Sequence, residues 1–287
     1  MSLKNADKFA VIDIGSNTIR GVLYSGGVKP SAKETITFQS HILADTKEGV
    51  LTVEGIFTLC ESLLKIKKGF LDIERVYAFA TSAMRDVKNF DEVYSAVKDK
   101  TGIEIDLVSG EREAEYDCLA LKSIVKKGIG VDLGGGSAQV VCFDENGVKE
   151  SLSMPIGVKR VRNMFCKAIT PTADEKEKIE NYIREEMSSI KGRSENIIFM
   201  GGTAKAVVRA AKKLLNKGSI TPEVIDELYK LTADNEKLLK NLFKERFATM
   251  PAGFIVMKCI CENLGGKNIT VTDVGVRDGY VVCITGD

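Results

Sequence analysis

Apolar side chains recur along the chain in two patterns, as short continuous runs and as longer stretches with helical spacing. Residues 9–14 form an apolar run, residues 19–24 are a second, mainly apolar segment across a turn from it, and residues 35–38 alternate between apolar and polar, so we expect three strands there. Residues 53–70 place apolar side chains three and four positions apart, which predicts an amphipathic helix. The other elements expected in this half are strands over residues 75–80 and 103–108 and helices over residues 90–98 and 110–124.

The same order of elements restarts near residue 130, although the two halves share negligible sequence identity. We expect strands over residues 130–133, 138–143, 148–154, 197–200 and 269–272 and helices over residues 157–167, 203–215, 222–232, 234–246 and 252–264, with one more beginning at the capping box of Thr172 and Glu175. The turn at residues 126–128 separates the halves. The pattern therefore predicts two similar α/β domains, residues 1–125 and 126–287, with the C-terminal residues packing back on the first domain.

Each half begins with a glycine-rich polar turn that follows an apolar run ending in an aspartate. The turn residues are Gly15, Ser16, Asn17 and Thr18 in the first half and Gly134, Gly135, Gly136 and Ser137 in the second. Glycines let the backbone turn sharply, so that successive N–H groups converge on an anion. Asp13 and Asp132 are suited to a hydrated divalent cation, which we expect to be Mg²⁺. One such turn looks the same as a β-hairpin with Asp-Gly chemistry. Two copies about 120 residues apart predict a polyphosphate group clamped in a cleft between the halves.

Charge and cysteine usage narrow the classes of function. The chain has 41 Lys and Arg against 40 Asp and Glu, a net charge of +1, so no global field attracts nucleic acid or a membrane, and contacts to a polyanion must be local. No apolar stretch reaches the roughly 20 residues of a membrane span, and no signal peptide is recognisable, so we expect a cytoplasmic protein. A single histidine, His41, argues against His-based zinc sites, Ser–His–Asp triads and Cys–His dyads. The seven scattered cysteines are expected as reduced thiols. A homodimer is compatible with the sequence.

Six ordered segments resemble the exopolyphosphatase / guanosine pentaphosphate phosphohydrolase family, in its short two-domain type. They are residues 10–20, 80–89, 108–115, 131–137, 201–203 and 274–279. The resemblance implies two domains of the actin-like ATPase (ribonuclease H-like) superfold with an interdomain cleft. It also implies a Mg²⁺-dependent hydrolase that releases the terminal phosphate of inorganic polyphosphate or of a guanosine polyphosphate such as pppGpp.

The resemblance assigns roles to further residues. Glu113 is implied as the catalytic residue, and the implied phosphate-binding residues outside the two turns are Arg20, Arg85, Gly201, Gly202, Thr203 and Arg277. The residues alone leave other interpretations open. Glu113, like Glu111 and Glu115, is an acid in the first turn of a helix, where the helix dipole favours it. Arg85 could form an ion pair with Asp86 or Asp91, and Arg20 and Arg277 could form structural salt bridges.

One position departs from the family pattern. The family has a glutamate two residues after the serine of the second turn, where this chain has Gln139. An amide is a weaker ligand for a hard cation than a carboxylate. The alternatives to a full phosphohydrolase are therefore a catalytically weak sensor of polyphosphate or a guanosine alarmone, and an ATP-dependent kinase or ATPase of the same superfold.

Overall fold

Two five-stranded sheets organise the computed structural model, which describes residues 8–25, 30–70, 73 and 75–286. The chain divides into unit 1, residues Met1–Tyr116 and Val276–Asp287, and unit 2, residues Asp117–Gly275. The division falls within α5 (Gly110–Lys122) and not at the turn at residues 126–128. The reason is that α5 packs its earlier residues into the core of unit 1 and its later ones into the core of unit 2.

Unit 1 contains a sheet of strand order β3-β2-β1-β6-β7. Its strands are β1 (Lys8–Ile14), β2 (Thr18–Ser25), β3 (Pro30–Gln39), β6 (Arg75–Ala80) and β7 (Ile105–Leu107). The first three strands are antiparallel, and β6 and β7 run parallel to β1. The hairpin turn that the sequence suggests at residues 26–27 lies outside the described residues.

Helices cover both faces of this sheet, which explains the continuous apolar run of β1. Ala10, Ile12 and Ile14 point into the core beneath α2 (Val53–Gly69) and α4 (Phe90–Thr101). Phe9 and Val11 alternate with them and point into a second core with α12 (Val276–Thr285). A strand buried on both faces needs apolar residues at every position, and β1 meets this requirement up to Asp13.

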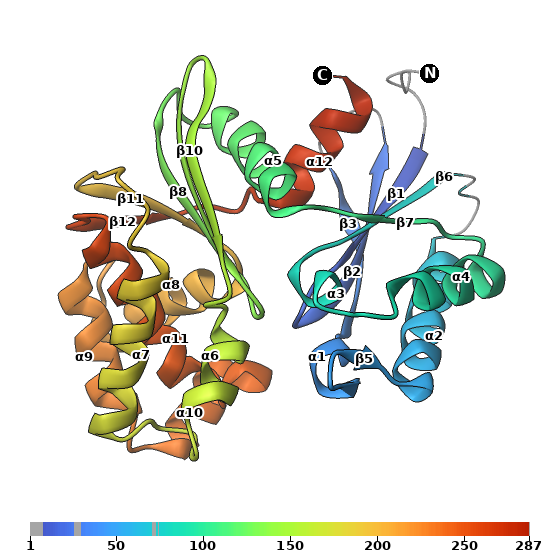
Figure 1. The fold of residues 1–287 in the computed structure, drawn as a ribbon. Helices are drawn as coiled ribbons and strands as arrows, with labels where there is room; N and C mark the ends of the chain where they lie inside the picture. Colours follow the sequence, from blue (N-terminus) through green and yellow to red (C-terminus); the bar gives the residue numbers. More distant parts are fainter. Residues whose placement is uncertain (1–7, 26–29, 71–72, 74, 287) are drawn as a thin grey trace. The chain divides into compact units, whose positions relative to one another are not determined.

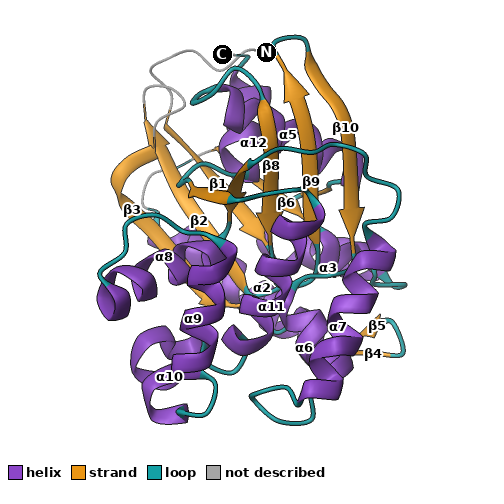
Figure 2. Cartoon of the chain, turned by 90° about the vertical axis from the view of Figure 1, so that its left-hand side faces the viewer, coloured by secondary structure: helices purple, strands orange, loops and turns teal. Residues whose placement is uncertain are grey.

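Unit 2 repeats this architecture with a sheet of strand order β10-β9-β8-β11-β12. Its strands are β8 (Gly128–Leu133), β9 (Ala138–Asp144), β10 (Gly147–Met154), β11 (Asn196–Met200) and β12 (Asn268–Val271). Its helical segments are α6 (Val158–Phe165), α7 (Ala173–Glu186), α8 (Gly202–Leu215), α9 (Pro222–Thr232), α10 (Glu236–Phe243), η1 (Lys244–Arg246) and α11 (Met250–Asn263). Helices α7 and α9 pack against the buried helix α11. Figure 1 shows these helices together below the sheet, and Figure 2 shows β8, β9 and β10 side by side.

The two sheets confirm the expected α/β fold class with two similar domains, because each unit has three antiparallel strands followed by two parallel ones in the same order. The elements that the sequence pattern missed are α1 (Ile42–Asp45), β4 (Thr46–Lys47), β5 (Val50–Leu51), α3 (Ser82–Arg85) and α12. Within the described residues, every helix is too short or too polar to cross a membrane.

Candidate active site

The two glycine-rich turns are the same structure in both units. In unit 1 the Gly15 N–H donates to Thr18 O at 3.0 Å, and in unit 2 the Gly134 N–H donates to Ser137 O at 3.0 Å. A Cβ atom on either glycine would lie 3.2 Å and 3.1 Å, respectively, from the same carbonyl oxygen, so both positions favour glycine. Each turn thus joins two antiparallel strands as a tight hairpin that begins two residues after the aspartate.

The turn of unit 2 is braced by the first turn of α6. The N–H groups of Val158, Lys159 and Arg160 donate to Gly134 O and Gly135 O at 2.9–3.1 Å. The Arg160 Nε donates to Gly136 O at 2.7 Å. In a trans peptide the N–H points opposite to the C=O. Because the three glycine carbonyls point toward α6, the next three N–H groups point away from it together, which suits an anion.

A third glycine turn lies beside this one. Gly201 has a φ of +95°, a conformation that favours glycine, and a Cβ there would lie 2.6 Å from Leu133 O and 3.0 Å from Asp132 Oδ1. Gly202 begins α8, and the buried Thr203 follows it. Since β8 and β11 are parallel neighbours, their carboxyl ends bring the Asp132 turn and the Gly201 turn to one edge of the sheet.

Two arginines that the sequence analysis did not single out lie at these turns. Arg160 reaches Gly136 from α6, as described above. The Arg246 guanidinium, from η1, lies against Gly202, where a Cβ would be 2.5 Å from Arg246 Nη2. Both come from segments with no recognisable motif, so only the tertiary structure reveals them. Together they place cationic charge next to the turns of unit 2.

Gln139 is buried opposite Asp132. The two residues are cross-strand partners in the β8–β9 register, and Gln139 is 2% exposed. Its Nε2 donates to Ser137 Oγ at 2.8 Å and to Ser153 Oγ at 3.2 Å. The amide nitrogen is therefore committed to two serine hydroxyls, one of them in the phosphate turn itself.

In unit 1 the equivalent edge of the sheet carries the candidate catalytic residue. The carboxyl ends of the parallel strands β1, β6 and β7 lead into the Gly15 turn, into α3 and into α5. Arg85 ends α3 and Glu113 lies in the first turn of α5. The Arg85 Nη1 lies 2.7 Å from Glu113 Oε2 and also donates to Val108 O at 2.7 Å.

The three acids near the start of α5 differ in position and exposure: Glu111 and Glu113 lie in the first turn, and Glu115 lies beyond it. Glu111 and Glu115 are exposed. The backbone N–H of Glu111 and the Ser109 hydroxyl lower the pKa of Glu111, as expected of an acid that serves the helix N-terminus. Glu113 is 4% exposed and held by Arg85. Burial of a carboxylate requires a partner of opposite charge, and Glu113 has one.

The residues around Asp13 form a second charged group in unit 1. Asp13 lies opposite Arg20 in the β1–β2 register, and the Arg277 Nε donates to Tyr24 Oη at 3.2 Å. Burial raises the pKa of Asp13, whereas the charges of Arg277 and Arg20 lower it and that of Asp278 raises it; the net pKa lies above its ordinary value. The structure therefore gathers Asp13, Arg20 and Arg277 beside the first turn.

Mg²⁺ is commonly bound by one or two carboxylates together with substrate phosphates and water. Within the described residues, His, Cys, Asp and Glu side chains do not gather in groups of three or more that could hold a metal ion. Asp132 has the Gln139 amide as its cross-strand partner, and its carboxylate is of the type that binds Mg²⁺ together with substrate phosphates. Asp13 has the guanidinium groups of Arg20 and Arg277 near it.

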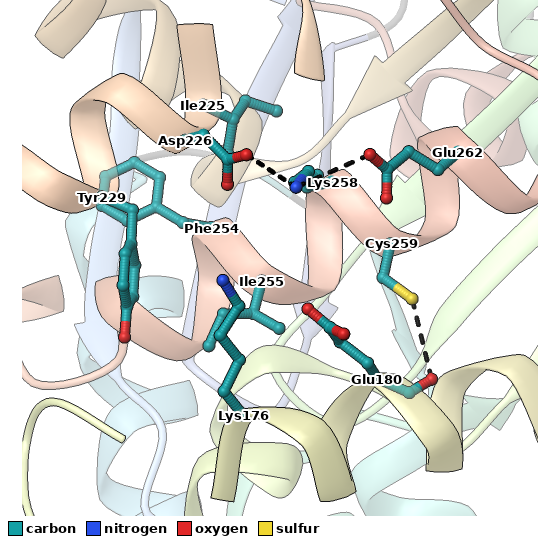
Figure 3. Close-up of a pocket in the computed structure, with 10 residues that line it drawn as sticks. All are labelled: Lys176, Glu180, Ile225, Asp226, Tyr229, Phe254, Ile255, Lys258, Cys259 and Glu262. Carbon is teal, nitrogen blue, oxygen red and sulfur yellow. Dashed lines mark hydrogen bonds and ion pairs between the residues drawn. The ribbon is translucent and has the colours of Figure 1, made fainter. Parts of the chain in front are cut away.

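Unit 2 also contains a small hollow among α7, α9 and α11, and its lining includes acidic as well as basic side chains (Figure 3). Lys258 lies between two carboxylates, 2.7 Å from Asp226 Oδ2 and 3.6 Å from Glu262 Oε1. Burial lowers the pKa of Lys258, but the two acids outweigh it and the net pKa is raised. Its positive charge is already matched by acids, so this hollow is a packing feature and not a polyanion site.

Known proteins share this sequence and fold over nearly its whole length. The chain is 23% identical over 305 residues to exopolyphosphatase 1 of Mycobacterium leprae, covering 96% of this chain and 88% of that protein. It is 26% identical over 304 residues to a bifunctional 3-dehydroquinate synthase/phosphatase of Fusobacterium nucleatum, covering 94% of this chain and 45% of that protein.

Solved protein structures are similar to this chain over the same length. A Ppx/GppA family member from Aquifex aeolicus superposes with a TM-score of 0.79 at 25% identity, covering 96% of this chain and 97% of that one. An exopolyphosphatase from Cytophaga hutchinsonii has the same fold, with a TM-score of 0.84 at 18% identity and 98% of each chain covered. The Ppx/GppA phosphatase family model matches residues 31–286. The chain belongs to the Ppx/GppA phosphatase family.

Proposed function

We propose that this phosphatase is a Mg²⁺-dependent phosphohydrolase that releases the terminal phosphate of inorganic polyphosphate or of a guanosine polyphosphate such as pppGpp. The observation that carries the proposal is the buried Glu113, held by Arg85 at the same sheet edge as the first glycine turn. A phosphoanhydride needs little covalent help from a protein; it needs a positioned water and groups that stabilise charge on the phosphoryl oxygens. The names of the relatives support a polyphosphate as substrate.

Each group has a defined task in this proposal. The Glu113 carboxylate accepts a hydrogen bond from the attacking water and orients its oxygen toward the terminal phosphorus. The water oxygen bonds to phosphorus as the bridging P–O bond breaks, the electron pair of that bond stays with the shortened chain, and the proton that the water loses passes to the Glu113 carboxylate. The ion pair with Arg85 fixes the direction in which the carboxylate points. The glycine turns and Arg20, Arg85 and Arg277 bind phosphoryl oxygens. Asp132 would hold Mg²⁺, which would supply positive charge to the phosphoryl oxygens bound at the turn of unit 2.

A side-by-side phosphate-release assay tests this function. Long-chain polyphosphate, tripolyphosphate, pppGpp and ATP are offered at equal concentration, with Mg²⁺ or with EDTA. We expect release from polyphosphate or pppGpp well above that from ATP, and we expect EDTA to abolish it. Preferential hydrolysis of ATP, or no release from any of the four, would contradict the proposal.

Gln139 favours one second candidate, a catalytically weak sensor that binds polyphosphate or a guanosine alarmone. The buried amide lies where a carboxylate would supply a hard oxygen ligand beside Asp132. Gln139→Glu distinguishes the candidates. A higher maximal rate in the variant supports a weakened enzyme or sensor. A lower rate with a higher KM means that the amide, through its bonds to Ser137 and Ser153, is adapted to catalysis.

A further inference from the structure

Helix α5 covers only part of the sheet face on which it lies in unit 2. The odd-numbered residues of β8 point into the large core that the sheet forms with α6–α11, so Gly128 and Gly130 face the other side, where α5 lies. A Cβ on Gly130 would lie 2.2 Å from Leu121 Cδ1, which shows tight contact with the helix. A Cβ on Gly128 would have its nearest neighbours, Ile198 and Phe143, at 3.6–3.9 Å. The strand therefore extends about 7 Å beyond its contact with the helix.

A second hollow of unit 2, with a volume of about 550 Å³, lies at this uncovered end of the sheet face. Its apolar lining includes Phe143 and Ile198 from the strands and Ile124 from the turn after α5. Ile124 is 48% exposed, so part of this apolar surface faces solvent. Thr270, the neighbour of Ile198 in the β11–β12 register, adds a hydroxyl. Sites for small organic ligands have this size, with a largely apolar lining and a few polar groups.

Two basic side chains, Lys127 and Arg193, line the same hollow. The Arg193 Nη1 donates to Ile190 O at 3.0 Å and to Gly192 O at 2.8 Å. These carbonyls hold the guanidinium in place without neutralising its charge. Within the part of the chain that the structure describes, neither Lys127 nor Arg193 forms an ion pair with an acid. Both positive charges are therefore available to a ligand.

The hollow is also lined by an acid, Asp144, whose charge is already matched. The Asp144 Oδ2 lies 3.1 Å from Lys149 Nζ, and Oδ1 accepts a hydrogen bond from the Asn146 N–H at 2.8 Å. These contacts lower the pKa of Asp144, the backbone N–H of Asn146 most of all. Since Lys149 balances Asp144, the remaining charge of the lining is positive, which favours an anionic ligand.

The hollow lies at the edge of the sheet where the parallel strands begin. Lys127 and Gly128 stand at the start of β8, and Arg193 comes shortly before β11. The glycine turns that follow Asp132 and Met200 are at the opposite edge, where the same strands end. Gly128 and Asp132 are four positions apart in one extended strand, about 13 Å. A ligand in the hollow would thus lie apart from the glycine turns of the candidate active site.

We propose that this hollow is a second binding site, separate from the candidate active site, for a small organic anion with a flat aromatic body. The aromatic body packs on Phe143 and Ile198, and burial of its apolar surface supplies most of the binding free energy. The anionic group contacts Arg193 and Lys127, which select for negative charge. Inorganic polyphosphate has no apolar body, so the site takes a different class of ligand from the proposed substrate.

Fluorescence titration of the full-length protein with anilinonaphthalene sulfonate tests the proposal, because this probe combines an aromatic body with one negative charge. Its uncharged analogue N-phenylnaphthylamine is titrated in parallel. We expect Arg193→Gln combined with Lys127→Gln to raise the Kd of the sulfonate about tenfold, as for loss of charge-assisted contacts. The Kd of the uncharged analogue should stay nearly unchanged.

A variant that fills the hollow tests the apolar part of the site. Gly128→Leu places a side chain toward Phe143 and Ile198, so we expect it to weaken binding of both probes about tenfold or more. Circular dichroism checks that this variant folds. If it does not, the variants of the exposed Lys127 and half-buried Arg193 still decide the proposal.

Two further variants are controls. Lys126→Gln removes the neighbouring charge, which lies 3.7 Å from Glu145 Oε1, and Arg246→Gln removes a charge at the glycine turns of unit 2. Neither should change the Kd of the sulfonate. The proposal is overturned if the sulfonate does not bind, if both probes respond equally to the charge variants, or if Lys126→Gln or Arg246→Gln weakens binding as much as Arg193→Gln with Lys127→Gln.

Discussion

Unit 1 and unit 2 share a fold and a glycine-rich turn, but the contacts around that turn differ between them. In unit 2 the carbonyls of three glycines are capped by α6, through backbone N–H groups and the Arg160 side chain. In unit 1 the corresponding turn accepts one bond from Ser40 N to Asn17 O among its described contacts outside the hairpin. Unit 1 instead carries the buried ion pair of Arg85 and Glu113.

The difference shows how duplication of one architecture allows specialisation. A rigid frame of backbone hydrogen bonds fixes N–H groups for binding, as in unit 2. Catalysis needs a carboxylate that is shielded from bulk water and held in one direction, and unit 1 supplies this with the contact between Glu113 and Arg85. The comparison predicts that loss of the Glu113 carboxylate lowers the rate, whereas damage to the braced turn of unit 2 lowers affinity.

The largest effect is expected from Glu113→Gln. The amide keeps the size of the side chain but cannot accept the proton or orient water as a carboxylate does, so the rate should fall about 10²- to 10⁴-fold with substrate affinity nearly unchanged. Steady-state kinetics and direct binding separate the two quantities. Glu115→Gln, on the exposed side of the same helix, is the control. A variant with the wild-type rate would remove catalysis from unit 1.

Gly157→Ala tests the packing of α6 against the glycine-rich turn of unit 2. A Cβ at this position would lie 2.3 Å from Gly136 C and from Ser137 N, so α6 and the turn must move apart. Overpacking of this kind costs about 1–3 kcal/mol of unfolding free energy, and KM for polyphosphate should rise. Urea unfolding and kinetics measure both. Gly218→Ala is matched to it, since a Cβ there meets nothing within 4 Å. Equal behaviour of the two variants would show that the frame is not needed.

Arg246→Gln tests the cationic side of unit 2. The guanidinium lies against Gly202, and loss of a charged contact to phosphate should raise KM about tenfold, which corresponds to about 1.4 kcal/mol, with a smaller change in kcat. Arg209→Gln, exposed on α8, should have little effect. If Arg246→Gln lowers kcat and leaves KM unchanged, the assignment of substrate binding to this part of unit 2 is wrong.

The smallest effect concerns the pH dependence of stability at Asp13. Its pKa in the folded protein is raised, so the folded state binds the proton over a pH window above 3.8 in which the unfolded state has released it. The stability that this proton contributes is present below that window and is lost as the pH rises through the folded pKa. Asn cannot titrate. The unfolding free energy of Asp13→Asn relative to wild type should therefore increase from pH 4 to pH 8, and urea unfolding at both pH values measures it. A difference that shrinks over this range would reverse the sign of the pKa shift.

Most of the fold could be predicted from the sequence because the central strands β1 and β8 are buried on both faces, which leaves apolar runs at these strands. Helix α12 was missed because it begins inside a glycine motif, and Gly279 is a poor helix former that the close contact with Tyr116 O requires. The division within α5 was missed because one continuous helix serves two cores.

The candidate site was predictable only where a motif marks it. The turns and Glu113 stand in recognisable segments. Arg160 and Arg246 approach the turns of unit 2 from α6 and η1. Because these contacts form by tertiary packing between segments far apart in the sequence, no local sequence pattern predicts them. The opposition of Asp13 to Arg20, and of Asp132 to Gln139, follows from strand register, which becomes certain once the hairpin bonds of the turns are known.

The position of α12 at the end of the chain affects the order in which the two units are completed during synthesis. Unit 2 is continuous in the sequence, whereas unit 1 is completed by a helix that follows it. A ribosome adding about 5–20 residues per second therefore spends on the order of ten seconds making unit 2 before Tyr280 emerges. During that time Phe79, which stacks on Tyr280 with ring centroids 4.6 Å apart in the finished protein, lacks its cover. Unit 1 is therefore completed only after all of unit 2 has been made.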